Sequence, residues 1–284
     1  QKIKIVEAAR PVPRPAPVPR STPPPAPDIN KKPDQPFTDV PANSPFAKTE
    51  EKLFNRGIIA GYPSTVKGEL LFKPQNLINR AEFTQIVLKM LCIIPREEAK
   101  KLPSPFYDVL DPSLWFYPAL KEGNIRGFIK GYLGEMRIGA DGIKRAPFKP
   151  ANNITRAEAV TVVLAALHEQ GIIDLNLADL KAWEGSPWYL PYVRIAQDLR
   201  PYLKQAADGD FSDSALKFLI TPQEALFASE KISRADFAVM ADRVLLIHDC
   251  NPPSIEVGRE PPVTPTPVPP STPPAPRPEL PKEW

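Results

Sequence analysis

Apolar residues in the middle of this chain recur at helical spacing in three separate segments. Each segment starts with an apolar residue and repeats apolar positions three, four, seven and eight residues later. This spacing places them in one stripe along a 3.6-residue period. The stripes are Phe83, Ile86, Val87, Met90 and Leu91; Ala159, Val162, Val163, Ala166 and Leu167; and Phe237, Met240, Ala241, Val244 and Leu245. Three helices with matching stripes predict one shared core.

The start of each predicted helix has the same local pattern. A capping residue is followed three positions later by an acid, which is typical of a capping box. The pairs are Asn79 with Glu82, Thr155 with Glu158, and Ser233 with Asp236. An arginine stands directly after each cap, at Arg80, Arg156 and Arg234. The segments are therefore copies of one repeat.

A second periodic segment precedes each of these helices. In two copies it begins with Phe37-Thr38-Asp39-Val40 or Phe106-Tyr107-Asp108-Val109 and reaches a Gly-Tyr pair at Gly61 or Gly131. The third copy lacks both signals. Each repeat is predicted to be a helix, a turn at glycine, a loop and a second helix. The sequence thus predicts a mainly all-α fold of three helix-loop-helix repeats.

The position of the three arginines needs an explanation beyond helix formation. The first helical position carries the positive end of the helix dipole, which disfavours a cation. A guanidinium beside helix amides is suited to a carboxylate or phosphate. We expect a ligand anion at these arginines; the alternative is an internal ion pair, for example to Asp39 or Asp108.

Two tryptophans stand at the front of their repeats. Trp115 and Trp188 occupy the place that Phe46 takes in the first repeat, seven residues after Asp39. A half-exposed tryptophan beside an arginine suits stacking on a sugar ring, whereas an aromatic at a helix start also suits the core. The residues alone leave both interpretations open.

Proline separates a globular body from two arms. Of 39 prolines, 11 lie in residues 1–36 and 13 in residues 252–284. Dense proline excludes helix and sheet and favours polyproline II. We expect the arms to act as spacers, and the alternative is that they bind along a partner protein. The chain begins with Gln1, which fits a mature protein after signal removal or a fragment.

Charge and composition exclude several classes of function. The net charge of +3 lies mostly in the N-terminal arm, which leaves a nearly neutral body and argues against nucleic acid. No apolar run is long enough to span a membrane. The soft ligands Cys92, Cys250, His168 and His248 are too few for a zinc-cysteine module, and we expect no metal or cofactor. We expect two separate buried thiols; the alternative is a bridge, because both cysteines fall near the end of a predicted helix.

An enzymatic role is not expected. Glycan cleavage needs two carboxyl groups facing each other across a cleft. The repeated acids Glu82 and Glu158 are assigned to capping, and Asp39 and Asp108 have no partner in the pattern. Two histidines, both near predicted helix ends, provide no nucleophilic triad.

The ordered motifs resemble the S-layer homology domain, here in three copies. They are Phe-x-Asp-Val, an aromatic residue, Gly-x-x-x-Gly-Tyr, Phe-x-Pro and the Arg-Ala-Glu helix start. The resemblance implies a pseudo-threefold helical spindle whose grooves bind an acidic, pyruvylated-type cell-wall polysaccharide or a peptidoglycan-linked glycan. It implies that the site residues are Arg80, Arg156, Arg234, Trp115, Trp188, Gly61 and Gly131.

The resemblance also sets boundaries and expectations for the whole chain. We divide it into an arm at 1–36, unit 1 at 37–102, unit 2 at 103–178, a degenerate unit 3 at 179–251 and an arm at 252–284. The implied function is non-catalytic anchoring at the cell surface, in the S-layer or in the periplasm of a bacterium, with other envelope proteins as partners of the arms. The alternative is a structural subunit of an extracytoplasmic assembly. Segment 133–147 is an insertion without a predicted role.

Overall fold

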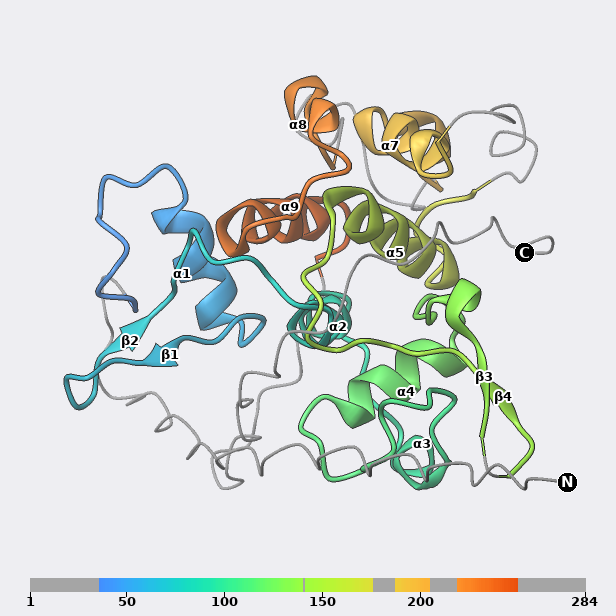
Figure 1. Cartoon of the computed structure of the whole chain (residues 1–284). Helices are drawn as coiled ribbons and strands as arrows, with labels where there is room; N and C mark the ends of the chain where they lie inside the picture. Colours follow the sequence, from blue (N-terminus) through green and yellow to red (C-terminus); the bar gives the residue numbers. More distant parts are fainter. Residues whose placement is uncertain (1–35, 140, 176–186, 205–218, 250–284) are drawn as a thin grey trace, which may run out of the picture.

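The computed structural model describes residues 36–139, 141–175, 187–204 and 219–249. The predicted proline-rich arms lie outside these residues, except for Pro36. The described chain is mainly helical, which confirms the predicted fold class (Figure 1). Short strands form two antiparallel hairpins, β1 Tyr62–Pro63 with β2 Leu70–Leu71, and β3 Arg137–Ile138 with β4 Lys144–Arg145. Both hairpins lie in the segments between the two main helices of a unit.

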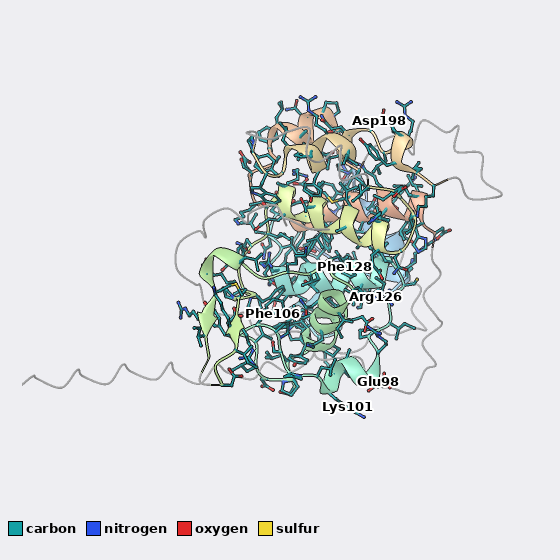
Figure 2. The ribbon with its side chains drawn as sticks, turned by 90° about the vertical axis from the view of Figure 1, so that its right-hand side faces the viewer. Glu98, Lys101, Phe106, Arg126, Phe128 and Asp198 are labelled. Carbon is teal, nitrogen blue, oxygen red and sulfur yellow. The ribbon has the colours of Figure 1, made fainter. Side chains whose placement is uncertain are left out.

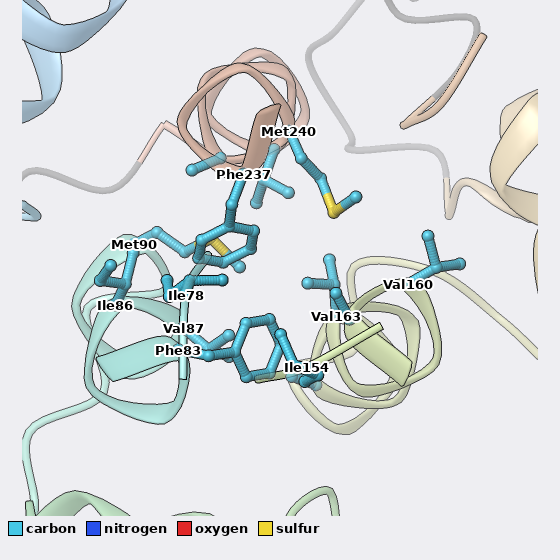
Figure 3. Packing of buried hydrophobic residues seen from close by; sticks show 14 of the residues in the cluster. Ile78, Phe83, Ile86, Val87, Met90, Ile154, Val160, Val163, Phe237 and Met240 are labelled. Atoms are coloured by element: carbon cyan, nitrogen blue, oxygen red, sulfur yellow. The ribbon is translucent and has the colours of Figure 1, made fainter. Parts of the chain in front are cut away.

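Three central helices build the core. They are α2 Arg80–Met90, α5 Arg156–Glu169 and α9 Arg234–Ile247. Their apolar stripes converge, and the rings of Phe83 and Phe237 lie 4.9 Å apart (Figure 3). Every predicted stripe residue is buried except Val162, which is partly exposed. The predicted stripes and their common core are confirmed.

An outer helix of each unit packs on the central helix of the preceding unit. These helices are α1 Ala47–Asn55, α4 Tyr117–Ile125 and α7 Leu190–Gln197. The helix α4 packs on α2, α7 packs on α5, and α1 packs on α9. Because α1 and α9 are the first and last described helices, their contact closes the ring of three units.

A cycle of backbone hydrogen bonds lies where the central helices begin. The amide of Ile78 donates to the carbonyl of Ile232, that of Ile154 to Ile78, and that of Ile232 to Ile154, at 3.1–3.2 Å. Each unit thus donates to one neighbour and accepts from the other. This cycle matches the expected pseudo-threefold arrangement.

Shorter helices complete the described chain. The helix α3 Glu97–Lys101 joins units 1 and 2, and α8 Pro222–Leu226 precedes the central helix of unit 3. Two 3₁₀ turns, η1 Leu133–Glu135 and η2 Arg200–Tyr202, lie in the connecting segments. The insertion at 133–147 therefore contains η1 and the β3–β4 hairpin.

Cys92 follows the end of α2 and is disulfide-bonded. The expectation of two separate thiols is wrong. The sequence has one other cysteine, Cys250, which lies outside the described residues. All three central helices start at the same hydrogen-bond cycle and run away from it, so the ends of α2 and α9 are brought to the same end of the bundle. Sequence spacing alone does not report this proximity.

Candidate functional site

Arg80 is built into the contact between units 1 and 2. Its Nε donates to the carbonyl oxygen of Phe148 and its Nη2 to that of Lys130, both at 2.8 Å. Its guanidinium also lies over the rings of Tyr132 and Phe148, at 4.6 and 4.8 Å from their centres. No described residue accepts a hydrogen bond from Nη1. Arg80 therefore combines a structural role with one unused donor.

Arg234 repeats this arrangement between units 3 and 1. Its Nε donates to the carbonyl oxygen of Phe72 at 2.8 Å, and Nη2 to that of Ala60 at 3.0 Å. Its Nη1 donates to the hydroxyl oxygen of Tyr62 at 3.1 Å. All three guanidinium nitrogens of Arg234 are thus used within the protein.

Arg156 occupies the same helix position but has different contacts. Its Nη2 donates to Asp236 at 2.9 Å. Its Nε and Nη1 are buried and have no hydrogen-bond partner within the described chain. The residue at the place of Phe72 and Phe148 is Leu226, the last residue of α8. The described part of unit 3 therefore does not offer the Arg156 guanidinium the backbone acceptors that units 1 and 2 provide for Arg234 and Arg80.

The aspartates of the Phe-x-Asp-Val motif do not pair with the arginines. Asp39 accepts hydrogen bonds from the amides of Phe72 and Lys73, both at 2.7 Å. Asp108 accepts from the equivalent amides in unit 2, those of Phe148 and Lys149, at 2.7 and 2.6 Å. The suggested ion pair to Asp39 or Asp108 is wrong. These carboxylates instead fix the segments whose carbonyl oxygens hold Arg234 and Arg80.

Two of the three predicted capping boxes are complete. Asn79 with Glu82 and Thr155 with Glu158 each form both reciprocal hydrogen bonds. In unit 3 the Ser233 side chain accepts from the amide of Asp236, and only this half is formed. The shorter Asp236 side chain pairs with Arg156 instead.

The tyrosines of the Gly-Tyr pairs are site residues that the sequence analysis did not select. The hydroxyl of Tyr62 donates to Glu82 at 2.5 Å, and that of Tyr132 donates to Glu158 at 3.3 Å. Burial raises the pKa of both hydroxyls above the usual value, so both stay protonated at neutral pH. The available signal in the sequence was that a tyrosine directly follows the glycine in both units 1 and 2.

A groove with a volume of about 150 Å³ lies beside Arg80. One wall is the segment after α4, where Phe128 lies on the α5 side of that helix (Figure 2). Residues of α2 and α5 also line the groove, together with Trp188 and with Tyr192 of α7. Its lining includes Arg80, Lys130, Gly131, Tyr132, Glu158, Thr161, Val162, Trp188 and Tyr192. The partial exposure of Val162 is explained by its place in this lining.

The groove brings together part of the predicted site. Arg80, Gly131 and Trp188 line it, although they come from three different units. Arg156, Arg234, Trp115 and Gly61 are not among its lining residues. Trp188 is half-buried, and its ring meets Tyr189 edge-on at 5.7 Å.

Trp115 makes the equivalent edge-on contact, with Phe116 at 5.3 Å, and packs against the core. Phe46 stands at the N-cap of α1, whereas the N-caps of α4 and α7 are Phe116 and Tyr189. Counted from the helix start, each tryptophan therefore lies one residue before the place that Phe46 takes.

Gly61 and Gly131 are required by close packing. A Cβ atom at Gly131 would lie 2.6 Å from the carbonyl oxygen of Pro147, and one at Gly61 would lie 2.8 Å from the ring of Phe37. Both distances are shorter than a normal contact. A side chain at either position would displace the segment that carries the arginine acceptors.

The sequence model of the S-layer homology domain matches residues 36–84 and 106–160. These ranges contain Asp39 and Asp108, each of which accepts from two consecutive amides and is called an Asp clamp below, together with the Gly-Tyr pairs and the starts of α2 and α5. The chain contains S-layer homology domain sequence in these two segments. Unit 3 lies beyond the two matched ranges, but it contributes the third member of the backbone hydrogen-bond cycle.

Two relatives come from Acetivibrio thermocellus. A cellulosome-anchoring protein is 29% identical over 188 residues, which cover 65% of this chain and 36% of that protein. Cell surface glycoprotein 1 is 36% identical over 110 residues, which cover 39% of this chain and 4% of that protein. The matched part thus spans about a third of the first relative and a small part of the second.

Two further features of the described residues bear on the site. They contain no group of three or more metal-ligating side chains placed to hold an ion. None of the helices in the described ranges has the length and apolar character needed to cross a bilayer.

Proposed function

We propose that this chain, which contains S-layer homology domain sequence, is a non-catalytic anchoring module at the bacterial cell surface. The groove beside Arg80 is its principal site for an acidic cell-wall glycan. The observation that carries the proposal is the combination of an unused guanidinium donor, Nη1 of Arg80, with an aromatic wall at Trp188 in one groove. The name of the cellulosome-anchoring relative supports the anchoring part of the proposal.

The chemistry of the groove suits a sugar that carries a carboxylate. Aromatic and aliphatic side chains from three units provide apolar surface for the faces of sugar rings. Arg80 is held in place by backbone acceptors and aromatic rings, so its remaining donor is preorganised for an anion. A pyruvylated sugar would present a carboxylate to this donor.

The three arginines are proposed to have unequal roles. Arg234 has every nitrogen satisfied by protein oxygens, so we assign it a structural role and expect Trp115 and Gly61 to contribute less to binding. Arg156 has two unused donors, but both of these nitrogens are buried and the residue does not line the groove beside Arg80. We propose that Arg156 provides at most a secondary anion site.

A catalytic role is not part of the proposal. Glu158, an acidic residue of the groove lining, accepts hydrogen bonds from the Thr155 amide and from Tyr132. It therefore serves the helix cap and the tyrosine.

The proposed partners of the proline-rich arms are other envelope proteins. A structural role in an extracytoplasmic assembly remains the second candidate function, because Arg80 and Arg234 both join neighbouring units.

The test is co-sedimentation of the full chain with purified wall fragments. Mild acid treatment that removes ketal-linked pyruvate should abolish binding. Trp188→Ala should weaken binding to untreated fragments about tenfold, as expected for a lost aromatic contact of about 1.4 kcal/mol.

Trp115→Ala is the matched control because it removes the equivalent tryptophan of unit 2. It should change binding less than Trp188→Ala, with both variants retaining the wild-type circular dichroism spectrum. Equal binding by wild type and Trp188→Ala would exclude the groove beside Arg80. Binding that survives ketal removal would exclude the acidic substituent as the ligand.

A further inference from the structure

Glu50 is an acidic side chain in the apolar interior of unit 1. It lies on α1 and is 1% exposed. Neither carboxyl oxygen has a hydrogen-bond partner in the described chain. Burying an unpaired carboxylate is strongly unfavourable, so such a group tends to take up a proton.

The equivalent positions in the other units are apolar. Glu50 lies four residues after the N-cap of α1, and the residues at the same distance in α4 and α7 are Leu120 and Val193. Both are buried. An ionisable group therefore replaces a core hydrophobe in one unit of the three.

The surroundings of Glu50 are mostly apolar. A cavity of about 200 Å³ beside it is lined by Phe37, Val40, Ala42 and Ala47, among others. Pro36 and the charged residues Lys48 and Glu51 of the same helix also line this cavity. The cavity provides room for the helix to move and for water to enter.

Charged groups from two other segments act on Glu50. Burial is the main cause that raises its pKa to about 7; nearby Asp39 raises it further, and Arg234 of α9 opposes the shift. On the surface of the same contact, Lys52 of α1 pairs with Asp242 of α9 at 2.6 Å, and Thr49 also bonds to Asp242. Arg234 and Asp242 both belong to α9, the helix that packs on α1, so charges of α9 act on Glu50 and on its neighbours Thr49 and Lys52; we call the contact between the two helices the α1–α9 seam.

We propose that Glu50 is a proton-dependent lock on the α1–α9 seam, closed when the side chain is neutral and loosened when it ionises. The seam joins the first and last described helices, so loosening it would open the ring of three units. This lock would act on the fold, and glycan binding at the groove beside Arg80 does not depend on it.

The direction of the pH dependence follows from the two protonation equilibria. The carboxyl group has a pKa of 4.5 as its ordinary value and about 7 in the folded protein, so the folded state binds the proton more tightly. Stability is greatest below pH 4.5, falls as the pH rises towards 7, and stays low above it. The difference between these two pKa values corresponds to a change of at most about 300-fold in the equilibrium constant for opening the seam.

Hydrogen–deuterium exchange of the full chain at pH 5 and pH 8 tests the lock. Rates are corrected for the intrinsic effect of pH on exchange. In the wild type, α1 amides should lose at least tenfold in protection at pH 8, while α4 and α7 should change little. In Glu50→Leu and Glu50→Gln, α1 protection should be the same at both pH values. Glu51→Gln removes a half-buried charge from the same helix and should behave like the wild type.

Three results would overturn the proposal. The first is equal α1 protection at both pH values in the wild type. The second is an unchanged pH dependence in the Glu50 variants. The third is a loss of protection at pH 8 that is uniform over α1, α4 and α7. Glu50→Gln keeps the size of the side chain, so the test stands even if Glu50→Leu does not fold.

Discussion

Arg80 and Arg156 begin equivalent helices, but their surroundings differ. Arg80 meets backbone acceptors in unit 2 and lies between two aromatic rings, with one donor left at an open groove. Arg156 meets one carboxylate in unit 3 and keeps two buried donors without partners. Each arginine therefore belongs to the motif of its own unit, whereas the acceptors that its guanidinium group meets belong to the next unit.

The difference can be traced to the acceptor segment. In units 1 and 2 an aspartate clamps two consecutive amides, and the carbonyl oxygen of the first clamped residue, Phe72 or Phe148, accepts from the arginine. Unit 3 lacks the aspartate of the motif, and α8 occupies the corresponding segment. Loss of the clamp in one unit therefore removes the acceptors of an arginine in another.

The largest expected change in stability distinguishes Arg80 from Arg156. Arg80→Met should lower the free energy of unfolding by about 3 kcal/mol, because it leaves the carbonyl oxygens of Phe148 and Lys130 without their donor. Arg156→Met should change stability by less than about 1 kcal/mol, since it also removes buried donors that have no partner. Urea unfolding measures both. Equal losses would contradict the proposed difference.

A smaller loss of stability is expected when the Asp clamp of unit 1 or unit 2 is removed. Asp108→Ala leaves the amides of Phe148 and Lys149 without acceptors and should cost about 2 kcal/mol. Asp39→Ala should have a similar effect in unit 1, because its two hydrogen bonds are equivalent. Asp111→Ala is a suitable control, since Asp111 is exposed and accepts its hydrogen bond from the amide of Ser113 within the same exposed loop. A clamp variant as stable as this control would contradict the assigned role.

The smallest expected effect is a gain in stability from a substitution in unit 3. Asp236→Glu supplies the longer side chain that completes the capping box in units 1 and 2, and should raise stability by about 0.5 kcal/mol. Thermal unfolding of the variant and the wild type measures the change. A loss of stability would indicate that the short Asp236 side chain is needed for its contact with Arg156.

Much of the local structure could be predicted from residue patterns. The three apolar stripes and their caps depend on neighbours within one or two helical turns, and they were predicted correctly apart from the second half of the Ser233 cap. The suggested ion pairs to Asp39 or Asp108 were wrong: within the described residues Arg80 donates to backbone carbonyl oxygens, and Arg234 donates to carbonyl oxygens and to the Tyr62 hydroxyl. Backbone acceptors carry no residue type, so no sequence pattern identified them.

The residue pattern also did not predict that the ionisable side chain of Glu50 is buried. Glu50 belongs to a polar stretch, Lys48-Thr49-Glu50-Glu51-Lys52, that gives no sign of its interior position. Its burial follows from the orientation of α1 against α9 and the Phe37 segment. The disulfide of Cys92 was missed for a related reason, because helix spacing in sequence does not state which helix ends meet.

Residue order alone is enough to establish the repeat, its helices and its resemblance to a known family, because those features depend on short-range spacing. The assembled ring determined which arginine is satisfied, which keeps an open donor and which carboxyl group is buried. Each of the arginine contacts depends on an atom from another unit, brought near by packing between segments 50 to 174 residues apart. Such long-range contacts are set by the three-dimensional closure of units 1, 2 and 3.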